Sequence, residues 1–326
     1  AVKFPDMVHS FKPDPRTNLD DDSRRFDFLS HHPEATRTLT LLYSNQGTPA
    51  SYRMMDGNGV HAYKFVNEQG ETHYVKFRWK SLQGLKNLDP KENEAMQGKD
   101  YSHLSRDLIT AIDSGDYPKW DLMIQVLKPE DLARFDFDPL DATKIWPDVP
   151  ERKIGQMVLN KNPDNIFQET EQVAMAPANL VPGIEPSEDR LLQGRLFSYA
   201  DTQMYRVGAN GMSLPINRPK VPVNNGNQDG QLNAGHTTSS VNYQPSRREN
   251  REETPRAVYS KLPLSGTTQQ APIQRQQNFK QAGDLYRSFS KKEQTDLINT
   301  LGGELAKADD EARHILLSFF YKADAN

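Results

Sequence analysis

The sequence contains no cysteine among its 326 residues. This absence excludes disulfide bonds, cysteine nucleophiles and metal centres with thiolate ligands. The chain also lacks an apolar run of the ~20 residues that a membrane-spanning helix requires. Its first residues, AVKFPDMVHS, have neither the basic region nor the apolar region of a signal peptide. We therefore expect a soluble, cytoplasmic protein without a membrane partner, with the periplasm as the alternative compartment.

The chain also has no large excess of positive or negative charge, since its formal net charge at pH 7 is -4. A balance this small gives no general electrostatic reason to expect nucleic acid as a partner. The eight histidines include no HExxH pattern or other close metal-ligand spacing. The sequence also has no GxSxG, Walker A or GxGxxG motif. Nucleotide hydrolysis and ordinary dehydrogenase chemistry are therefore unsupported.

What the chain does contain is the composition of a globular protein, with 35% hydrophobic and 26% charged residues. The clearest strand signal lies in VHAYKFV and THYVKFRWK, which alternate in polarity on either side of a loop with a glycine. WDLMIQVL and IGQMVLNKN add a third and a fourth candidate strand. Four antiparallel strands are half of a typical small barrel and would leave unpaired edges, so we expect the chain to be part of a larger structure.

Apolar residues at helical spacing predict helices before and after these strands. Two helices precede them, in SRRFDFLS and PEATRTLTLLYSN, and a polar helix is predicted over residues 91–114. Three more are predicted at the end of the chain, with Ser290 and Asp309 as caps. Residues 208–270 hold too much proline, asparagine and glycine for regular elements. That stretch is either disordered or an arm that wraps another surface.

One helical segment, RLFSYADTQMYR, places a tyrosine between two arginines. Residues 195, 199, 202, 203 and 206 fall on one stripe of this helix, so Tyr199 lies between Arg195 and Arg206. In one interpretation Tyr199 fills a gap in the core while the arginines extend along the surface. In the other, Tyr199 ionises, because a nearby guanidinium and coordination to ferric iron both favour the phenolate.

Many segments of the chain resemble the monofunctional haem catalases of the small-subunit type, in which tyrosinate is the standard iron ligand. They occur in the family's order: FPDMVHSFKPDP, YRMMDGNGVHAYKFVN, GKDYSHL, KIGQMVLNKNP, PGIEPSEDRLLQGR, RLFSYADTQMYR and NNGNQDG. The resemblance implies an α+β fold with the second half of a catalase-like antiparallel β-barrel, a long wrapping arm and a C-terminal all-helical region.

The same resemblance implies four regions along the chain. Residues 1–60 would form the edge of the distal pocket and surface helices, and residues 61–160 the second half of the barrel. Residues 161–250 would be the wrapping arm with the proximal haem helix, and residues 251–326 the C-terminal helical region.

The resemblance also implies a haem b cofactor with Tyr199 as the axial iron ligand. Arg195 matches the arginine whose guanidinium contacts the phenolate oxygen and keeps the ligand anionic. His61 and Asp189 match the residues that extend this charge network behind Arg195. Taken alone, His61 would be interpreted as a structural histidine at the end of a strand.

Further positions match residues that surround the haem in the family. Arg206 matches an arginine that pairs with a haem propionate, a bidentate use of guanidinium against carboxylate. Thr202 and Leu191 match residues that line the haem, and Phe4 matches an aromatic residue at the edge of the distal pocket. Gln203 stands where some relatives have histidine, so we expect it to be a variable neighbour of the haem.

In the family, the distal histidine and asparagine lie upstream of the segment that FPDMVHS matches. The resemblance therefore implies a C-terminal portion of a catalase subunit that lacks both residues. It implies the disproportionation of hydrogen peroxide to water and dioxygen, in a homotetramer that includes the N-terminal part of the subunit. Two alternatives stay open: a non-catalytic haem-binding fragment, and a catalase-related enzyme that acts on organic hydroperoxides.

Some catalases also bind NADPH at their surface, and this chain only partly matches the residues that they use. Two positions match and four depart, which argues against tight NADPH binding; the matches are Ser44 and Lys80, and the departures are Gln46, Arg37, Arg78 and Asp148.

Overall fold

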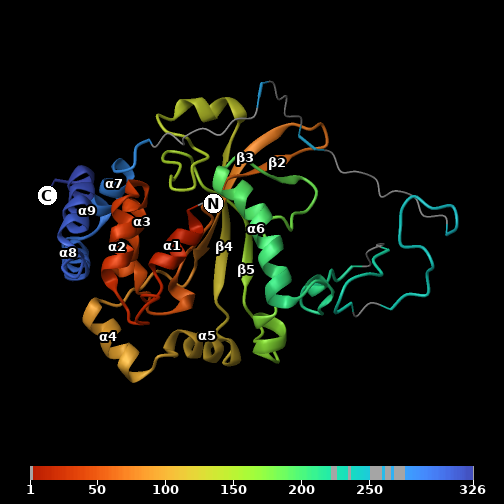
Figure 1. The fold of residues 1–326 in the computed structure, drawn as a ribbon, viewed down its shortest axis with the longest axis horizontal. Coiled ribbons are helices and arrows are strands. Elements are labelled where there is room, and N and C mark those ends of the chain that lie inside the picture. Colours follow the sequence, from red (N-terminus) through yellow and green to blue (C-terminus); the bar gives the residue numbers. More distant parts are fainter. Residues whose placement is uncertain are drawn as a thin grey trace. The chain divides into compact units, whose positions relative to one another are not determined.

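The computed structural model describes residues 3–221, 226–233, 236–249, 259–260, 266–267 and 276–325. The chain forms two compact units, and Figure 1 labels their helices and strands. The first unit contains Ala1–Ala62, Val75–Lys161 and Leu264–Asn326, and the second contains Tyr63–Tyr74 and Asn162–Pro263. The four regions expected from the sequence remain a prediction. No helix within the described ranges has the length and apolar character to cross a bilayer.

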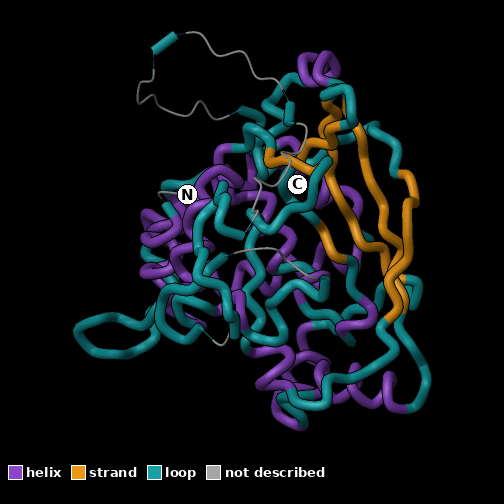
Figure 2. Tube along the Cα trace, turned by 90° about the vertical axis from the view of Figure 1, so that its right-hand side faces the viewer, coloured by secondary structure: helices purple, strands orange, loops and turns teal. Residues whose placement is uncertain are grey.

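The first unit is built on an antiparallel sheet, whose strands are orange in Figure 2. Its strands are β1 (Gly57–Asn58), the part of β3 (Thr72–Ser81) from Val75 onward, β4 (Lys119–Leu127) and β5 (Arg152–Val158). β4 lies between β5 and β3, and it pairs with β5 through Trp120 opposite Met157. Trp120, Ile124 and Leu127 are buried, which agrees with the strand predicted from WDLMIQVL.

Helices from the two ends of the chain share the core of the first unit. The early helices are α1 (Phe4–Ser10), α2 (Asp22–Ser30) and α3 (Thr36–Leu42), and the late ones are α7 (Lys280–Ser288), α8 (Lys291–Leu305) and α9 (Asp310–Ala323). In Figure 1 the red α2 and α3 lie beside the blue C-terminal helices, and α2 contacts α9 while α3 contacts α7. Their shared core consists of Phe26, Leu29, Leu39, Phe289, Leu297, Leu301, Leu305, Ala308 and Leu316.

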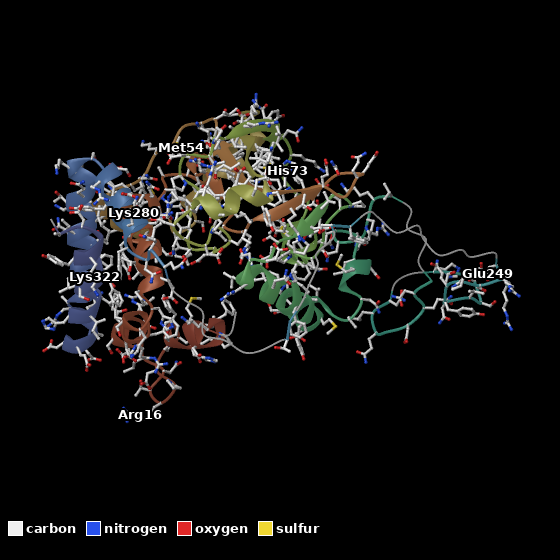
Figure 3. All side chains as sticks on the ribbon, turned by 90° about the horizontal axis from the view of Figure 1, so that it is seen from above. Arg16, Met54, His73, Glu249, Lys280 and Lys322 are labelled. Carbon is white, nitrogen blue, oxygen red and sulfur yellow. The ribbon has the colours of Figure 1, made fainter. Side chains whose placement is uncertain are left out.

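The three C-terminal helices confirm the sequence prediction. The Ser290 side chain accepts a hydrogen bond from the amide of Glu293, and the Glu293 carboxylate accepts one in return, which forms a capping box at the start of α8. Asp309 occupies the N-cap of α9 without a side-chain cap bond. Lys280 and Lys322, labelled in Figure 3, stand at the first residue of α7 and near the last of α9.

The predicted single helix over 91–114 is wrong. The structure has two helices there, α4 (Pro90–Lys99) and α5 (His103–Asp113). Asp100 separates them in an extended conformation, and its carboxylate accepts hydrogen bonds from the amide of Ser102 and from Arg106. A short acidic side chain that binds nearby donors competes with helical hydrogen bonding, so the polar pattern continues while the helix stops.

The second unit carries the segment with the two arginines and the tyrosine. Its elements are β2 (Tyr63–Val66), the first residues of β3, a π-helical turn (Phe167–Glu171), β6 (Ile184–Pro186), α6 (Arg190–Val207) and a 3₁₀ turn (Gly211–Ser213). The predicted hairpin of β2 and β3 is confirmed. β6 pairs antiparallel with β2, with Tyr63 opposite Pro186, and was not expected because its residues lie within a proline-rich stretch.

The predicted arm over 208–270 falls partly outside the described residues. Within the part that is described, no helix or multi-residue strand lies between Ser213 and Lys280. An antiparallel sheet combined with separate helical regions is an α+β fold, as expected from the sequence.

Candidate functional site

The position of α6 is determined at its first turn by Asp189. This carboxylate is buried, at 1% exposure, and its Oδ1 accepts hydrogen bonds from the amides of Leu191 at 2.9 Å and Leu192 at 3.1 Å. An N-cap aspartate satisfies amides that lack a helical partner and places negative charge at the positive end of the helix dipole. Leu192 is fully buried, so its side of the first turn faces the protein interior.

The other end of α6 is closed by Gly208. Its φ of +94° is a conformation that residues with a side chain rarely adopt. A Cβ at this position would also lie 2.6 Å from Cδ1 of Leu232. The helix therefore ends at Val207, and the stripe expected from the sequence lies entirely within α6.

Arg195 and Tyr199 interact directly on this stripe. Arg195 Nη2 donates a hydrogen bond to the phenol oxygen of Tyr199 at 2.8 Å. The guanidinium carbon lies 4.9 Å from the centre of the tyrosine ring, within the range of a cation–π contact. Both residues are half-buried. A cationic donor on the phenol oxygen favours negative charge there, which is the condition for a phenolate metal ligand.

Tyr63, which the sequence analysis did not single out, lies close to this pair. Burial raises the pKa of the Tyr63 phenol, while the positive charge of Arg195 lowers it and the negative charge of Asp189 raises it. Both charges therefore act on one phenol of β2, and Asp189 and Arg195 belong to one electrostatic environment. The only sequence signal for Tyr63 was an aromatic residue in a strand next to His61.

Arg206 and Gln203 contact the chain segment that precedes α6. Arg206 Nε donates to Gln203 Oε1 at 3.0 Å, and Nη1 donates to the carbonyl of Glu171 at 2.7 Å. Arg206 Nη2 donates to the carbonyl of Val173, and Gln203 Nε2 donates to that of Met175 at 3.0 Å. The arginine predicted to hold a propionate thus uses three of its five N–H groups on protein acceptors.

The remaining predicted residues lie in different places. Thr202 is exposed on α6, and Leu191 is 39% exposed near its start. His61 is buried, at 5% exposure, and belongs to the first unit, as does Phe4, which is 61% exposed at the start of α1. The roles expected for His61 and Phe4 stay predictions.

An ionic cluster around the buried Lys64 of the second unit was missed by the sequence analysis. Lys64 of β2 is 3% exposed in its side chain, and its Nζ lies 2.9 Å from Glu188 Oε1 and 3.8 Å from Glu185 Oε2. Tyr74 donates from its hydroxyl to Glu188 Oε2 at 2.8 Å. Burial raises the pKa of Glu188, but hydrogen bonds from Lys64 and Tyr74 outweigh it and leave that pKa below its ordinary value. Burial, followed by the bond to Glu188, raises the pKa of Tyr74.

Two of the residues considered for NADPH line one cavity of the first unit. Arg37 and Asp148 belong to a cavity of about 670 Å³. Arg78 forms ion pairs with Asp56 at 2.6 Å and Glu151 at 3.0 Å. Ser44 is buried and donates to the carbonyl of Leu41, so its hydroxyl serves the local turn. The expectation against tight NADPH binding stays a prediction.

The chain was compared with known protein families and proteins. Residues 1–250 match the family described as Catalase, and residues 272–326 match the family described as Catalase-related immune-responsive. A catalase of Pseudomonas aeruginosa is 76% identical over 326 residues, which are 100% of this chain and 64% of that protein. Catalases of Vibrio cholerae and Listeria seeligeri are 57% and 47% identical, over 99% of this chain and 65% and 67% of those proteins.

Solved structures agree with these relatives. A bacterial catalase superposes with a TM-score of 0.91 at 30% identity, and a fungal catalase with a TM-score of 0.88 at 34% identity. The matches cover 100% and 99% of this chain and 68% of each of those chains. The chain thus spans about 64% of the length of the Pseudomonas aeruginosa relative. On both sequence and structure, it belongs to the catalase family.

Proposed function

We propose that this chain carries the proximal side of a haem b site and acts in the disproportionation of hydrogen peroxide to water and dioxygen. The observation that carries the proposal is the 2.8 Å hydrogen bond from Arg195 Nη2 to the phenol oxygen of Tyr199. A phenol oxygen that accepts from a guanidinium is a good donor for ferric iron. Membership of the catalase family supports the same cofactor and substrate.

The residues around Tyr199 fit a haem. Tyr199 is only half-buried, and Thr202, one turn further along the same stripe, is exposed. Leu191 offers an apolar side chain that is 39% exposed near the start of α6. When bound, the haem supplies an iron that hydrogen peroxide can oxidise and then reduce. In this proposal Tyr199 holds the iron, Arg195 keeps the phenol oxygen anionic, and the carboxylate of Asp189 balances the charge of Arg195.

Arg206 still has donors to offer a haem propionate. Three of its N–H groups bind protein acceptors, and one N–H on each Nη atom is left. We assign these two to the propionate, with Gln203 as a neighbour that orients the guanidinium.

The acid–base group that takes and returns the peroxide proton is proposed to come from outside these 326 residues. The distal histidine and asparagine expected for the family match no residue here, and the chain spans 64% of its Pseudomonas aeruginosa relative. We propose a cytoplasmic homotetramer that contains this missing part of the subunit.

The test is to purify the complete polypeptide, record its absorption spectrum, measure oxygen release from hydrogen peroxide and compare this turnover with that of a lipid hydroperoxide. We expect a haem spectrum and vigorous oxygen release, and Tyr199→Phe should lose most haem and all activity because phenylalanine offers no oxygen to iron. Tyr205→Phe is the matched control, since Tyr205 is 83% exposed on the same helix. Haem without oxygen release would indicate a non-catalytic haem-binding protein, and preference for a lipid hydroperoxide would indicate a different enzyme. A normal spectrum and turnover in Tyr199→Phe would overturn the assignment.

A further inference from the structure

The 171–175 segment runs beside α6 and is attached to it along one edge. The carbonyl of residue 171 accepts from Arg206 Nη1 at 2.7 Å, and the carbonyl of residue 175 accepts from Gln203 Nε2 at 3.0 Å. The carbonyl between them, of residue 173, accepts from Arg206 Nη2. Gln203 and Arg206 lie one and two turns after Tyr199 on the same stripe. The segment therefore lies beside the part of α6 that is one to two turns after Tyr199.

Asn217 holds the peptide groups of this segment that α6 does not reach. Its Oδ1 accepts from the amide of Ala174 at 2.8 Å, and its Nδ2 donates to the carbonyl of Gln172 at 2.8 Å. Side chains of α6 bind the carbonyls of residues 171, 173 and 175, while Asn217 binds the carbonyl of 172 and the amide of 174.

Asn217 also joins the segment to the turn that follows α6. The same Nδ2 donates to the carbonyl of Gly211 at 3.0 Å, within the 3₁₀ turn Gly211–Ser213. Both donors of the amide and its acceptor are thus used, and Asn217 itself is half-buried. The short side chain of asparagine carries both a hydrogen-bond donor and an acceptor in one plane. An ionised aspartate has no donor, and alanine has neither a donor nor an acceptor.

We propose that Asn217 is a positioning residue of the haem site: it fixes the 171–175 segment so that Gln203 and Arg206 keep their orientation beside Tyr199. The inference rests on the proposed function, because it assigns Asn217 a role toward the haem that α6 would hold. Asn217 touches neither Tyr199 nor Arg195 in the described contacts, and it acts through the main chain of 171–175. Without Asn217, the segment would lose its hydrogen bonds at Gln172 and Ala174. The carbonyls of residues 171 and 173, which accept from Arg206, would then be free to move.

The experiment compares Asn217→Ala and Asn217→Asp with the wild type, all purified as the complete polypeptide with haem. The rate at which haem passes to excess apomyoglobin is expected to rise about tenfold in Asn217→Ala, since three hydrogen bonds are lost. Asn217→Asp keeps the acceptor for Ala174 but turns a second oxygen toward two carbonyls, so it should release haem at least as fast. Both variants should shift the absorption bands of the bound haem, because the surroundings of the iron ligand change.

Asn210→Ala is the matched control. Asn210 also donates twice from Nδ2, to the carbonyls of Gln231 at 2.6 Å and Asp229 at 3.2 Å, but it does not contact the 171–175 segment. We expect its haem release and absorption bands to equal those of the wild type.

Two results would overturn the inference while leaving the proposed function intact. The first is a wild type with haem and activity and Asn217 variants with unchanged haem release and spectra, even if their unfolding midpoints fall. The second is failure of both Asn217 variants to fold while Asn210→Ala folds, which would make Asn217 a folding determinant. A wild type that binds no haem would instead overturn the proposed function itself.

Discussion

Arg195 donates from Nη2 to the phenol oxygen of Tyr199, one helical turn further along α6, at 2.8 Å. Because both residues belong to one helix, the helix itself brings the cation and the phenol together. The pair needs no contact from another part of the chain to form. The phenolate that we propose at Tyr199 therefore depends on local structure.

Arg195→Gln is expected to remove the positive charge of this pair while keeping a hydrogen-bond donor near the phenol oxygen of Tyr199. Glutamine can still donate to the phenol oxygen, but the positive charge that favours phenolate is gone. We expect shifted haem absorption bands and an oxygen release about tenfold slower, since bonds to charged groups are worth about 1.5–3 kcal/mol. Arg190→Gln, an exposed arginine at the first residue of the same helix, should behave as the wild type. Equal turnover in Arg195→Gln would show that its charge is not required.

Asp189→Ala is expected to lower the free energy of unfolding by about 1–2 kcal/mol, because α6 loses its N-cap. Asp189→Asn retains an oxygen that can accept from Leu191 and Leu192, so its loss should be smaller. Urea unfolding of the three proteins checks this order. If asparagine destabilises as much as alanine, the negative charge at this position matters more than capping.

Glu188 is expected to make stability fall at acidic pH. Its pKa in the folded protein lies below its ordinary value of 4.5. A carboxylate with a lowered pKa contributes stability above its unfolded pKa and loses it as the pH falls through the folded pKa. In urea unfolding between pH 7 and 3, the wild type should therefore lose stability below about pH 4.5 more steeply than Glu188→Gln. Parallel curves for the two proteins would contradict this assignment.

Phe26→Ala tests the core that joins the early and late helices of the first unit. Phe26 has 0% exposure, so we expect the free energy of unfolding to drop by about 3–5 kcal/mol. Leu42→Ala is the control, since Leu42 is 55% exposed and its change should stay within about 0.5 kcal/mol. Measuring both by urea unfolding checks the difference, and similar losses at the two positions would be inconsistent with this core.

Local elements were predictable because their signals are local. Alternating polarity in β2 and β3 and the capping box at Ser290 depend on residues a few positions apart, and each appears in the structure as expected. The Arg195–Tyr199 pair was predictable for the same reason. The break between α4 and α5 was not predictable, because the polar pattern continues on both sides of Asp100 while this single residue ends the first helix.

By itself, the sequence determined the C-terminal helices, the hairpin, the family and the stripe that carries Tyr199, since spacing along one element is enough to place such residues together. Only the tertiary structure decided which distant residues contact these elements. Asn217 meets Ala174 from 43 positions away, and Lys64 meets Glu188 from 124. No periodicity links residues so far apart, because their contact depends on how the chain returns and on which buried polar groups still need a partner.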